Sequence, residues 1–391
     1  MTVFVVCGKA NFTNLARYGE YSERTYRRQY QKSFDFISFH AQTIALAIPS
    51  SREQIAAIDC SFINKSGKQT WGLDFFYNGS HSKAEKGLEI SVISVIDVET
   101  RQGYTLSVQQ TPANEQKVIK AQNQSKQKKQ ELMSERMRTY IAQVVKARPH
   151  LPESVKYLVG DGFYSKKGFV DGVRGQDLHL IGKLRIDANM RYLYTGAQKP
   201  KGAHRKYDGK VDLNDLSRLD HICEVDENIH LYSKVLWHVT LKRRIRVAYL
   251  VNCQNPDKIL AALLFSTDTE ISPECLYAYY KARFQIEFIF RDAKQFMGLS
   301  DCQSRNKSSL DFHFNVSLAA LNIAKLDQLQ ANIPFEEDDV QPQSCSMATY
   351  KRQALNGHLL ERFICMLDLD PTLIKSHPNY ASLLQYGSMS S

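Results

Sequence analysis

Two aspartates occupy positions from which a carboxylate can do chemistry. Asp59 follows the apolar run IAAI and Asp161 follows the run LVG, so each side chain is expected where a short strand ends. Side chains at strand ends are held by the sheet but still reach solvent, which suits metal binding or acid–base catalysis. Aspartate also ends strands because it favours turns, and for each residue taken alone this structural interpretation is the stronger one.

A long helical pattern in the C-terminal half carries a third carboxylate and strengthens the chemical interpretation. Counted from Tyr280, the residues Arg283, Glu287 and Lys294 follow at offsets of 3, 7 and 14. At 100° per residue these four fall within a wedge of about 60°, and Arg291 extends the same face. One carboxylate beside three cations and a phenol suits a phosphate-rich substrate together with a divalent cation. The apolar positions lie on a separate arc: Tyr279, Ala282, Ile286, Ile289, Ala293, Phe296 and Met297.

Hydrophobic periodicity predicts the elements that must position these side chains. Strands are expected at 55–58, 71–77, 88–98, 104–110, 155–160 and 178–184, the first four as an antiparallel meander. Helices are expected at 10–49, 132–145, 165–173, 273–297, 308–333 and 345–366. This order of strands and helices implies a mixed sheet with helices on its faces.

Residues 187–262 interrupt that order and predict a β-rich insertion. Within it, 199–210 are expected to form a basic loop, and 231–253 a hairpin with a basic tip. The segment 335–344 has the composition of an acidic, proline-containing linker, and the last dozen residues are expected to fray.

Composition limits the class of protein. The 391 residues are 43% hydrophobic and 24% charged, which is typical of a folded globular chain and excludes overall disorder. No apolar run approaches the roughly 18–20 residues that a membrane span needs. The 51 Lys and Arg outnumber the 41 Asp and Glu, and a net charge of +10 favours a nucleic-acid partner.

Several kinds of cofactor lack support in the sequence. No two of the eight cysteines have the spacing of a zinc ribbon or finger, and there is no HExxH sequence. Neither a P-loop nor a GxGxxG sequence is present, so a nucleotide cofactor is not indicated.

Basic residues alternate with aromatic ones near the N-terminus. Arg24, Arg27 and Arg28 follow a potential N-cap at Ser22, and two tyrosines lie between and after them. This composition suits contact with phosphates together with stacking on bases. A solvated basic helix face explains it equally well.

The pattern Tyr280-x2-Arg283-x3-Glu287-x6-Lys294 resembles the YREK signature of a large group of bacterial insertion-sequence transposases of the DDE type. Asp59 and Asp161 resemble the first and second catalytic aspartates of that family. The resemblance covers about residues 50–305. It implies an α/β fold with an RNase-H-like mixed sheet flanked by helices, a β-rich insertion before the last catalytic helix, and helical N- and C-terminal flanks.

The resemblance also implies the chemistry. Asp59, Asp161 and Glu287 would be the catalytic residues and would hold two Mg²⁺ ions, for which Mn²⁺ can substitute. The activity implied is DNA strand cleavage and strand transfer in the cut-and-paste transposition of an insertion element. The partners implied are double-stranded DNA, both the element's terminal inverted repeats and the target, and a second copy of the chain. A prokaryotic cytoplasm, close to the nucleoid, is the implied location.

Further residues are expected to contact DNA. They are the helix residues Tyr280, Arg283, Arg291 and Lys294, the N-terminal Arg24, Arg27 and Arg28, and the insertion residues Trp237, Arg243, Arg244 and Arg246, with Lys242 and the loop 199–210. Trp237 is a candidate for stacking on a flipped base, although a tryptophan in a strand is more often part of the core.

The domain organisation follows from the same comparison. Residues 1–50 are expected to form a helical DNA-binding region, which is short for a complete domain, and 334–391 a linker and a C-terminal helical region. The catalytic core would comprise 51–186 and 266–333, separated by the insertion at 187–265. Two alternatives stay open: another RNase-H-like nuclease, and a transposase-derived DNA-binding protein that no longer cleaves.

Overall fold

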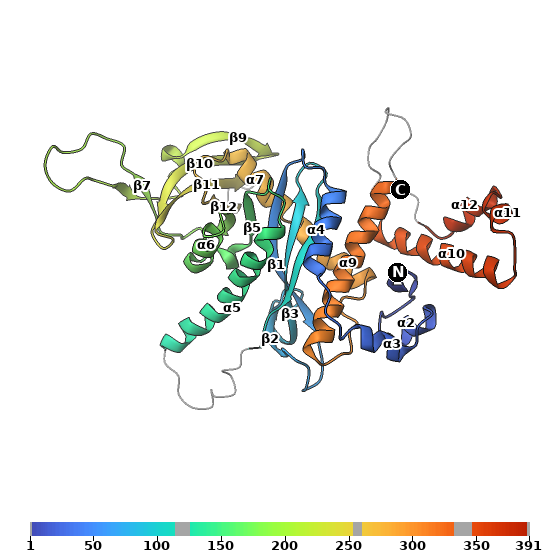
Figure 1. Ribbon diagram of the computed structural model, residues 1–391. Coiled ribbons are helices and arrows are strands. Elements are labelled where there is room, and N and C mark those ends of the chain that lie inside the picture. Colours follow the sequence, from blue (N-terminus) through green and yellow to red (C-terminus); the bar gives the residue numbers. More distant parts are fainter. Residues whose placement is uncertain (1, 114–125, 253–259, 332–345, 389–391) are drawn as a thin grey trace.

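The computed structural model describes residues 2–113, 126–252, 260–331 and 346–388 (Figure 1). The acidic linker expected at 335–344 lies outside these ranges. Within them, no helix combines the length and apolar character needed to cross a membrane.

Six strands form the part of the sheet that was expected to be the core. They are β1 (Gln54–Asn64), β2 (Asp74–Asn78), β3 (Lys83–Asp97), β4 (Gln102–Gln110), β5 (Tyr157–Gly160) and β6 (His179–Leu184). β3 pairs antiparallel with β1, β2 and β4, so the predicted antiparallel block is confirmed. β5 lies parallel to both β1 and β6, which makes the sheet mixed.

The insertion is rich in strands, as expected, and continues the same sheet. Its strands are β7 (Met190–Leu193), β8 (Tyr207–Lys210), β9 (Asp220–Asp226), β10 (Ile229–His238), β11 (Arg243–Asn252) and β12 (Leu260–Ser266). Antiparallel pairing of β12 with β6 joins the two parts. The strand order is therefore β2-β3-β1-β5-β6-β12-β11-β10-β7-β8, with β4 beside β3 and β9 beside β10.

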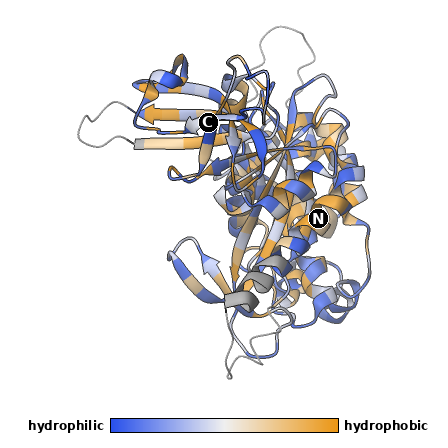
Figure 2. Ribbon diagram, turned by 90° about the vertical axis from the view of Figure 1, so that its left-hand side faces the viewer, coloured by the Kyte–Doolittle hydropathy of each residue, from blue (hydrophilic) through white to orange (hydrophobic). Residues whose placement is uncertain are grey.

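Helices cover both faces of this sheet. α4 (Phe36–Ala47), α5 (Lys126–Ala147) and α6 (Lys167–Arg174) pack on one face. α7 (Pro273–Ala282), α8 (Gln285–Phe296) and α9 (Lys307–Ala331) pack on the other. Successive strand residues point to opposite faces, so Ile58 of β1 joins the first core and Ala57 the second. Hydrophobic residues accordingly run along the strands in Figure 2. The predicted fold class, an RNase-H-like mixed sheet flanked by helices, is confirmed.

The helix predicted at 273–297 is in fact two helices. Between α7 and α8, the N–H groups of Ile286 and Glu287 bond to the carbonyl oxygens three residues earlier, at 3.0 Å each, so the chain tightens into a turn at Arg283 and Phe284. α7 packs on β6 and on the insertion strands, whereas α8 packs on β1, β4 and α9. Because the sheet twists between these strands, one straight helix cannot follow both parts.

The N- and C-terminal flanks lie side by side (Figure 1). The first three helices are α1 (Thr2–Val5), α2 (Phe12–Tyr18) and α3 (Glu23–Gln29), and the last three are α10 (Met347–Met366), α11 (Pro371–Lys375) and α12 (Asn379–Leu384). Lys351 of α10 donates to the carbonyl oxygens of Val6 at 3.2 Å and Phe296 at 2.8 Å, which ties both flanks to α8. Fraying was expected over the last dozen residues, but 379–384 are helical, and Asn356 donates to the Leu384 carbonyl at 2.9 Å.

Candidate active site

Asp59 lies within β1 and not at its end, because β1 continues to pair with β3 as far as Asn64 opposite Gly87. The parallel neighbour β5 stops earlier, at Gly160 opposite Ile58. Asp59 is therefore the first residue of β1 that has no neighbour in β5, although it is still paired with β3. It continues the face of Ala57, which is the face covered by α7 and α8.

Asp161 directly follows β5 and supports the turn after it. Its Oδ1 accepts the N–H of Phe163 at 2.9 Å. Two residues before it, Val159 belongs to the core beneath α7 and α8, so Asp161 continues the same face of the sheet as Asp59. The residue thus combines the turn-forming role of a strand-ending aspartate with a position beside Asp59.

Arg283 joins two of the three carboxylates. Its Nη1 lies 3.0 Å from Asp59 Oδ2, and its Nη2 lies 3.1 Å from Glu287 Oε1. The guanidinium side chain is only 12% exposed, and its Nε is buried with no hydrogen-bond partner among the residues that the structure describes. The turn between α7 and α8 places Arg283 at the end of one helix and Glu287 in the first turn of the next.

All three acids interact electrostatically with this guanidinium. Burial raises the pKa of Asp59 to about 6; Arg283 opposes that rise, while Asp161 and Glu287 add to it. The pKa of Arg283 is raised because the attraction of Asp59, Glu287 and Asp161 outweighs the effect of its burial. Like charges so close together favour protonation of one of them unless a cation neutralises the group.

The donor set fits a hard divalent cation, which prefers carboxylate oxygens. Each of the three carboxylates interacts with the same positive charge, that of Arg283. In the part of the chain that the structure describes, however, no three His, Cys, Asp or Glu side chains are arranged to hold a metal ion. Arg283 binds an oxygen of Asp59 and an oxygen of Glu287 that such an ion would need.

The other residues of the helix pattern separate. Tyr280 is half-buried beside the acids, with the guanidinium carbon of Arg283 5.6 Å from its ring centre. Lys294 is exposed and lies in the last turn of α8. Arg291 instead pairs with Asp292 at 2.9 Å and lies over the Phe288 ring, where it lines a cavity between α8 and α9.

The insertion residues expected to meet DNA also divide into two groups. Arg243 forms an ion pair with Asp171 of α6, and Arg246 donates twice to the Thr269 carbonyl, at 3.0 and 2.7 Å. Both side chains therefore hold the insertion to the core. Arg244 is exposed and lies directly opposite Trp237 in the pairing of β10 with β11. Trp237 is half-buried, and its ring centre lies 5.7 Å from that of Tyr207.

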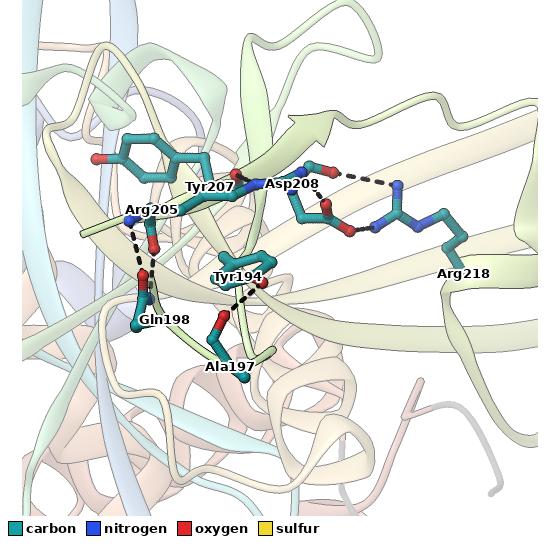
Figure 3. Close-up of polar contacts among 7 residues, drawn as sticks. All are labelled: Tyr194, Ala197, Gln198, Arg205, Tyr207, Asp208 and Arg218. Carbon is teal, nitrogen blue, oxygen red and sulfur yellow. Dashed lines mark hydrogen bonds and ion pairs between the residues drawn. The ribbon is translucent and has the colours of Figure 1, made fainter. Parts of the chain in front are cut away.

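The basic loop between β7 and β8 is folded on its own side chains (Figure 3). Gln198 and Arg205 exchange two hydrogen bonds, with Gln198 donating at 2.8 Å and accepting at 2.9 Å. Asp208 forms ion pairs with two arginines, through Oδ1 with Arg205 and through Oδ2 with Arg218. These contacts occupy two of the arginines around the loop and give it a defined shape.

The N-terminal arginines lie on α3, whose predicted N-cap is confirmed by a hydrogen bond from the Thr25 N–H to Ser22 at 3.3 Å. Arg27 pairs with Glu23, and Arg24 and Arg28 are exposed. Tyr30 packs edge-on against Phe12, with ring centres 4.8 Å apart, and Tyr26 packs against the same small hydrophobic cluster. Both rings are thus engaged with neighbouring side chains, whereas the exposed arginines can contact phosphates.

Comparison with known proteins identifies a family for this chain. The family model described as Transposase DDE domain matches residues 50–323, a span that contains β1, β5 and α8 with their carboxylates. No relative was found among curated proteins. Because the match extends over well more than half of the chain, the protein belongs to the Transposase DDE domain family.

Proposed function

We propose that this protein is a Mg²⁺-dependent DDE transposase that cleaves and rejoins DNA during cut-and-paste movement of an insertion element. Family membership supports a transposase in general terms. The observation that carries the finer proposal is the pair of contacts from Arg283 to Asp59 and Glu287, with Asp161 beside them. A partly exposed site with three acids and one cation suits the phosphodiester of DNA.

Each residue receives a role. Asp59, Asp161 and Glu287 would hold two metal ions, which in such sites activate the attacking oxygen and stabilise the leaving oxygen at phosphorus. Arg283 and Lys294 would bind phosphate oxygens near the scissile bond, because a guanidinium and an ammonium both donate to them. Tyr280 would orient a phosphate or stack on a base beside Arg283. The half-buried position of Tyr280 limits its freedom and favours a fixed contact.

The partners follow from the same proposal. Double-stranded DNA would bind as the element's terminal inverted repeat and as the target, and two copies of the chain would bring two ends together. Arg24, Arg28 and Arg244 are the exposed residues best placed for phosphate contact. Trp237 remains the candidate for stacking on a base, next to Arg244.

Two alternatives are compatible with the fold. Another RNase-H-like nuclease would need the three acids but not the extended β-rich insertion. A DNA-binding protein without cleavage activity would keep the basic surface and lose the chemistry. The presence of three acids around one guanidinium favours a protein that cleaves.

Glu287→Gln tests the proposal directly. The variant keeps the size of the side chain and a hydrogen-bond acceptor for Arg283 but lacks the charge needed to hold a metal. Mg²⁺-dependent cleavage of a duplex carrying the element's own end should disappear, while binding of that duplex stays intact or tightens. The substrate sequence would come from the short inverted repeats that the proposal expects in the DNA on either side of the gene.

The matched control is Glu153→Gln, because Glu153 is exposed in the segment before β5, away from the three acids. This variant should cleave as the unmodified protein does. Full cleavage by Glu287→Gln would show that α8 does not carry the catalytic acid. Binding without cleavage by the unmodified protein, at all Mg²⁺ concentrations, would favour the DNA-binding alternative.

A further inference from the structure

A large cleft lies beside the turn that follows Asp161. Its volume is about 1110 Å³. One wall is the turn itself, with Gly162, Ser165 and Lys166. The rest of the lining comes from the segment 183–189, which leads into β7, from the end of β10 and the turn that follows it, and from Ala261 of β12. The cleft is therefore built where the predicted core meets the predicted insertion.

Positive charge dominates its walls. Lys166, Lys183 and Arg185 contribute three cations, against one carboxylate, Asp187. Arg185 grips Asp187 with two hydrogen bonds of 2.9 Å, so that pair is neutral. Among the described residues, Lys166 and Lys183 have no carboxylate within ion-pair distance, and two net positive charges remain for a ligand.

Lys183 connects the cleft to the carboxylates. In the parallel pairing of β5 with β6, Val159 lies opposite Ile181, and both belong to the core beneath α7 and α8. Two residues further along each chain come Asp161 and Lys183, which continue the same face. Ser165 donates to the Lys183 carbonyl at 2.7 Å and holds the turn against β6.

A buried histidine lines the cleft from the insertion side. His238 is 5% exposed, and its Nδ1 accepts the N–H of Leu241 at 3.1 Å. A neutral imidazole that accepts at Nδ1 carries its proton at Nε2. Burial lowers the pKa of His238, which keeps the ring neutral at physiological pH. The residues that line the cleft thus include an uncharged imidazole together with Lys166 and Lys183.

We infer that this cleft binds the phosphodiester backbone of a DNA strand as it leaves the carboxylates, with Lys183 as the phosphate contact nearest to Asp161. The inference rests on the proposed function and adds a binding site to it. Ammonium groups and an imidazole N–H recognise phosphate oxygens without reading bases, so the contact should not depend on sequence. The strand can belong to the element's own end or to the target DNA, since both present the same backbone.

The test is a double variant, Lys166→Ala with Lys183→Ala, compared with Lys156→Ala. Lys156 is exposed immediately before β5, at the opposite end of that strand, so its loss removes charge without touching the cleft. Binding is measured by fluorescence anisotropy in EDTA over a range of salt concentrations. In a plot of log affinity against log salt concentration, the slope of the double variant should be smaller in magnitude by about two, which is about one for each phosphate contact removed. Lys156→Ala should keep the original slope.

A second measurement locates the contact on the DNA. Neutral methylphosphonates are placed one at a time along each strand, starting from the scissile position. At the phosphates that the cleft binds, a methylphosphonate should weaken binding of the unmodified protein. It should not change the affinity of the double variant, because that variant already lacks the lysines that make the contact. If methylphosphonates weaken binding of a pre-cleaved element end, the bound strand belongs to the element. If they weaken binding of the target duplex, it belongs to the target.

The outcomes separate this inference from the proposed function. If the double variant shows the same salt slope and the same methylphosphonate sensitivity as Lys156→Ala, the cleft does not bind DNA and the inference is wrong, although cleavage by the unmodified protein would still support a transposase. If the unmodified protein neither binds nor cleaves the element's end, the proposed function itself falls. Equal melting temperatures of the variants show that each measurement reports on binding and not on folding.

Discussion

At the level of single residues, Arg283 binds two carboxylates in the structure and is also the proposed ligand of a DNA phosphate. Its guanidinium lies 3.0 Å from Asp59 Oδ2 and 3.1 Å from Glu287 Oε1. The proposed chemistry needs these same oxygens for metal and needs Arg283 for phosphate. In the proposed mechanism, DNA phosphate would give the guanidinium an alternative partner and would release the carboxylates. Metal binding and DNA binding should therefore support each other.

The first prediction concerns Arg283→Gln in the absence of DNA. Without the competing guanidinium, Mn²⁺ should bind about ten-fold more tightly or better, since each charge-assisted hydrogen bond contributes about 1.5–3 kcal/mol. The variant should also melt lower than the unmodified protein without metal and regain more stability when Mg²⁺ is added, because it leaves two carboxylates unpaired. Isothermal titration and thermal melting measure the two effects.

Arg291→Gln is the control for that experiment, because Arg291 pairs with Asp292 and contacts none of the three acids among the described residues. It should bind Mn²⁺ as the unmodified protein does. Equal metal affinity of Arg283→Gln and Arg291→Gln would mean that Arg283 does not compete with metal.

At the level of elements, sequence periodicity predicted most of what positions the site. Alternation and apolar runs located the strands, and the buried arc of α8 agrees with Ile286, Ile289 and Ala293, all fully buried. Periodicity did not reveal the turn at Arg283 and Phe284, because both residues keep helical dihedral angles there and only the hydrogen-bond spacing changes. That change depends on which strands lie beneath each helix, which is a tertiary property.

The same limit explains two other differences. Asp59 was expected at a strand end, but the length of β1 is set by pairing with β3, a partner that lies more than twenty residues further along the chain. Lys183 attracted no attention in the sequence because a lysine at the end of a strand is common. Only the register of β5 with β6 places it beside Asp161. The roles of these residues in catalysis stay predictions.

A second prediction tests whether α8 must sit close to the sheet. Gly103 of β4 lies beneath α8, where an added Cβ would come within 3.1 Å of Ile289 Cδ1 and 3.3 Å of Gln285 Cβ. Gly103→Val should push α8 outward, destabilise the fold by about 1–3 kcal/mol and displace Glu287. Because displacements of about 1 Å cost up to about 10²-fold in rate, cleavage should fall by ten-fold or more while DNA binding persists.

Gly79→Val provides the comparison, because Gly79 has no neighbouring atom within 4 Å of an added Cβ. It should leave the cleavage rate unchanged. If Gly103→Val cleaves at the original rate, the position of α8 on β4 does not control the site.

At the level of the whole molecule, two buried histidines make stability depend on pH. Burial lowers the pKa of His40 and of His313 from 6.5 to about 4. As pH falls through that window, the unfolded chain takes up protons that the folded protein does not, so the free energy of unfolding decreases. At roughly 1.4 kcal/mol per pKa unit the loss is up to about 3 kcal/mol for each histidine. Above pH 6.5 this stabilisation is fully present.

His313→Gln should reduce this dependence by about half, because glutamine can still donate to the Gly298 carbonyl that His313 Nε2 contacts at 2.9 Å but does not titrate, whereas His40 still does. Denaturant unfolding at a series of pH values between 4 and 7 gives the slope. His204→Gln, at an exposed position, should keep the original slope. A steep, unchanged pH dependence in His313→Gln would assign acid sensitivity to other groups.

The last prediction concerns the charge of the whole chain and which part of it faces DNA. If about six to ten phosphates are contacted, affinity should fall about 10³–10⁵-fold between 50 and 200 mM salt. Arg28 and Arg244 are exposed and have no ion pair within the described ranges, so each one replaced by alanine should reduce the salt slope by about one. Arg246→Ala should instead lower the melting temperature and leave the slope nearly unchanged, because Arg246 already donates to the Thr269 carbonyl through Nε and Nη2. Anisotropy titrations of one duplex at several salt concentrations compare the three variants. If the affinity of the unmodified protein hardly changes with salt, the protein does not contact about six to ten phosphates.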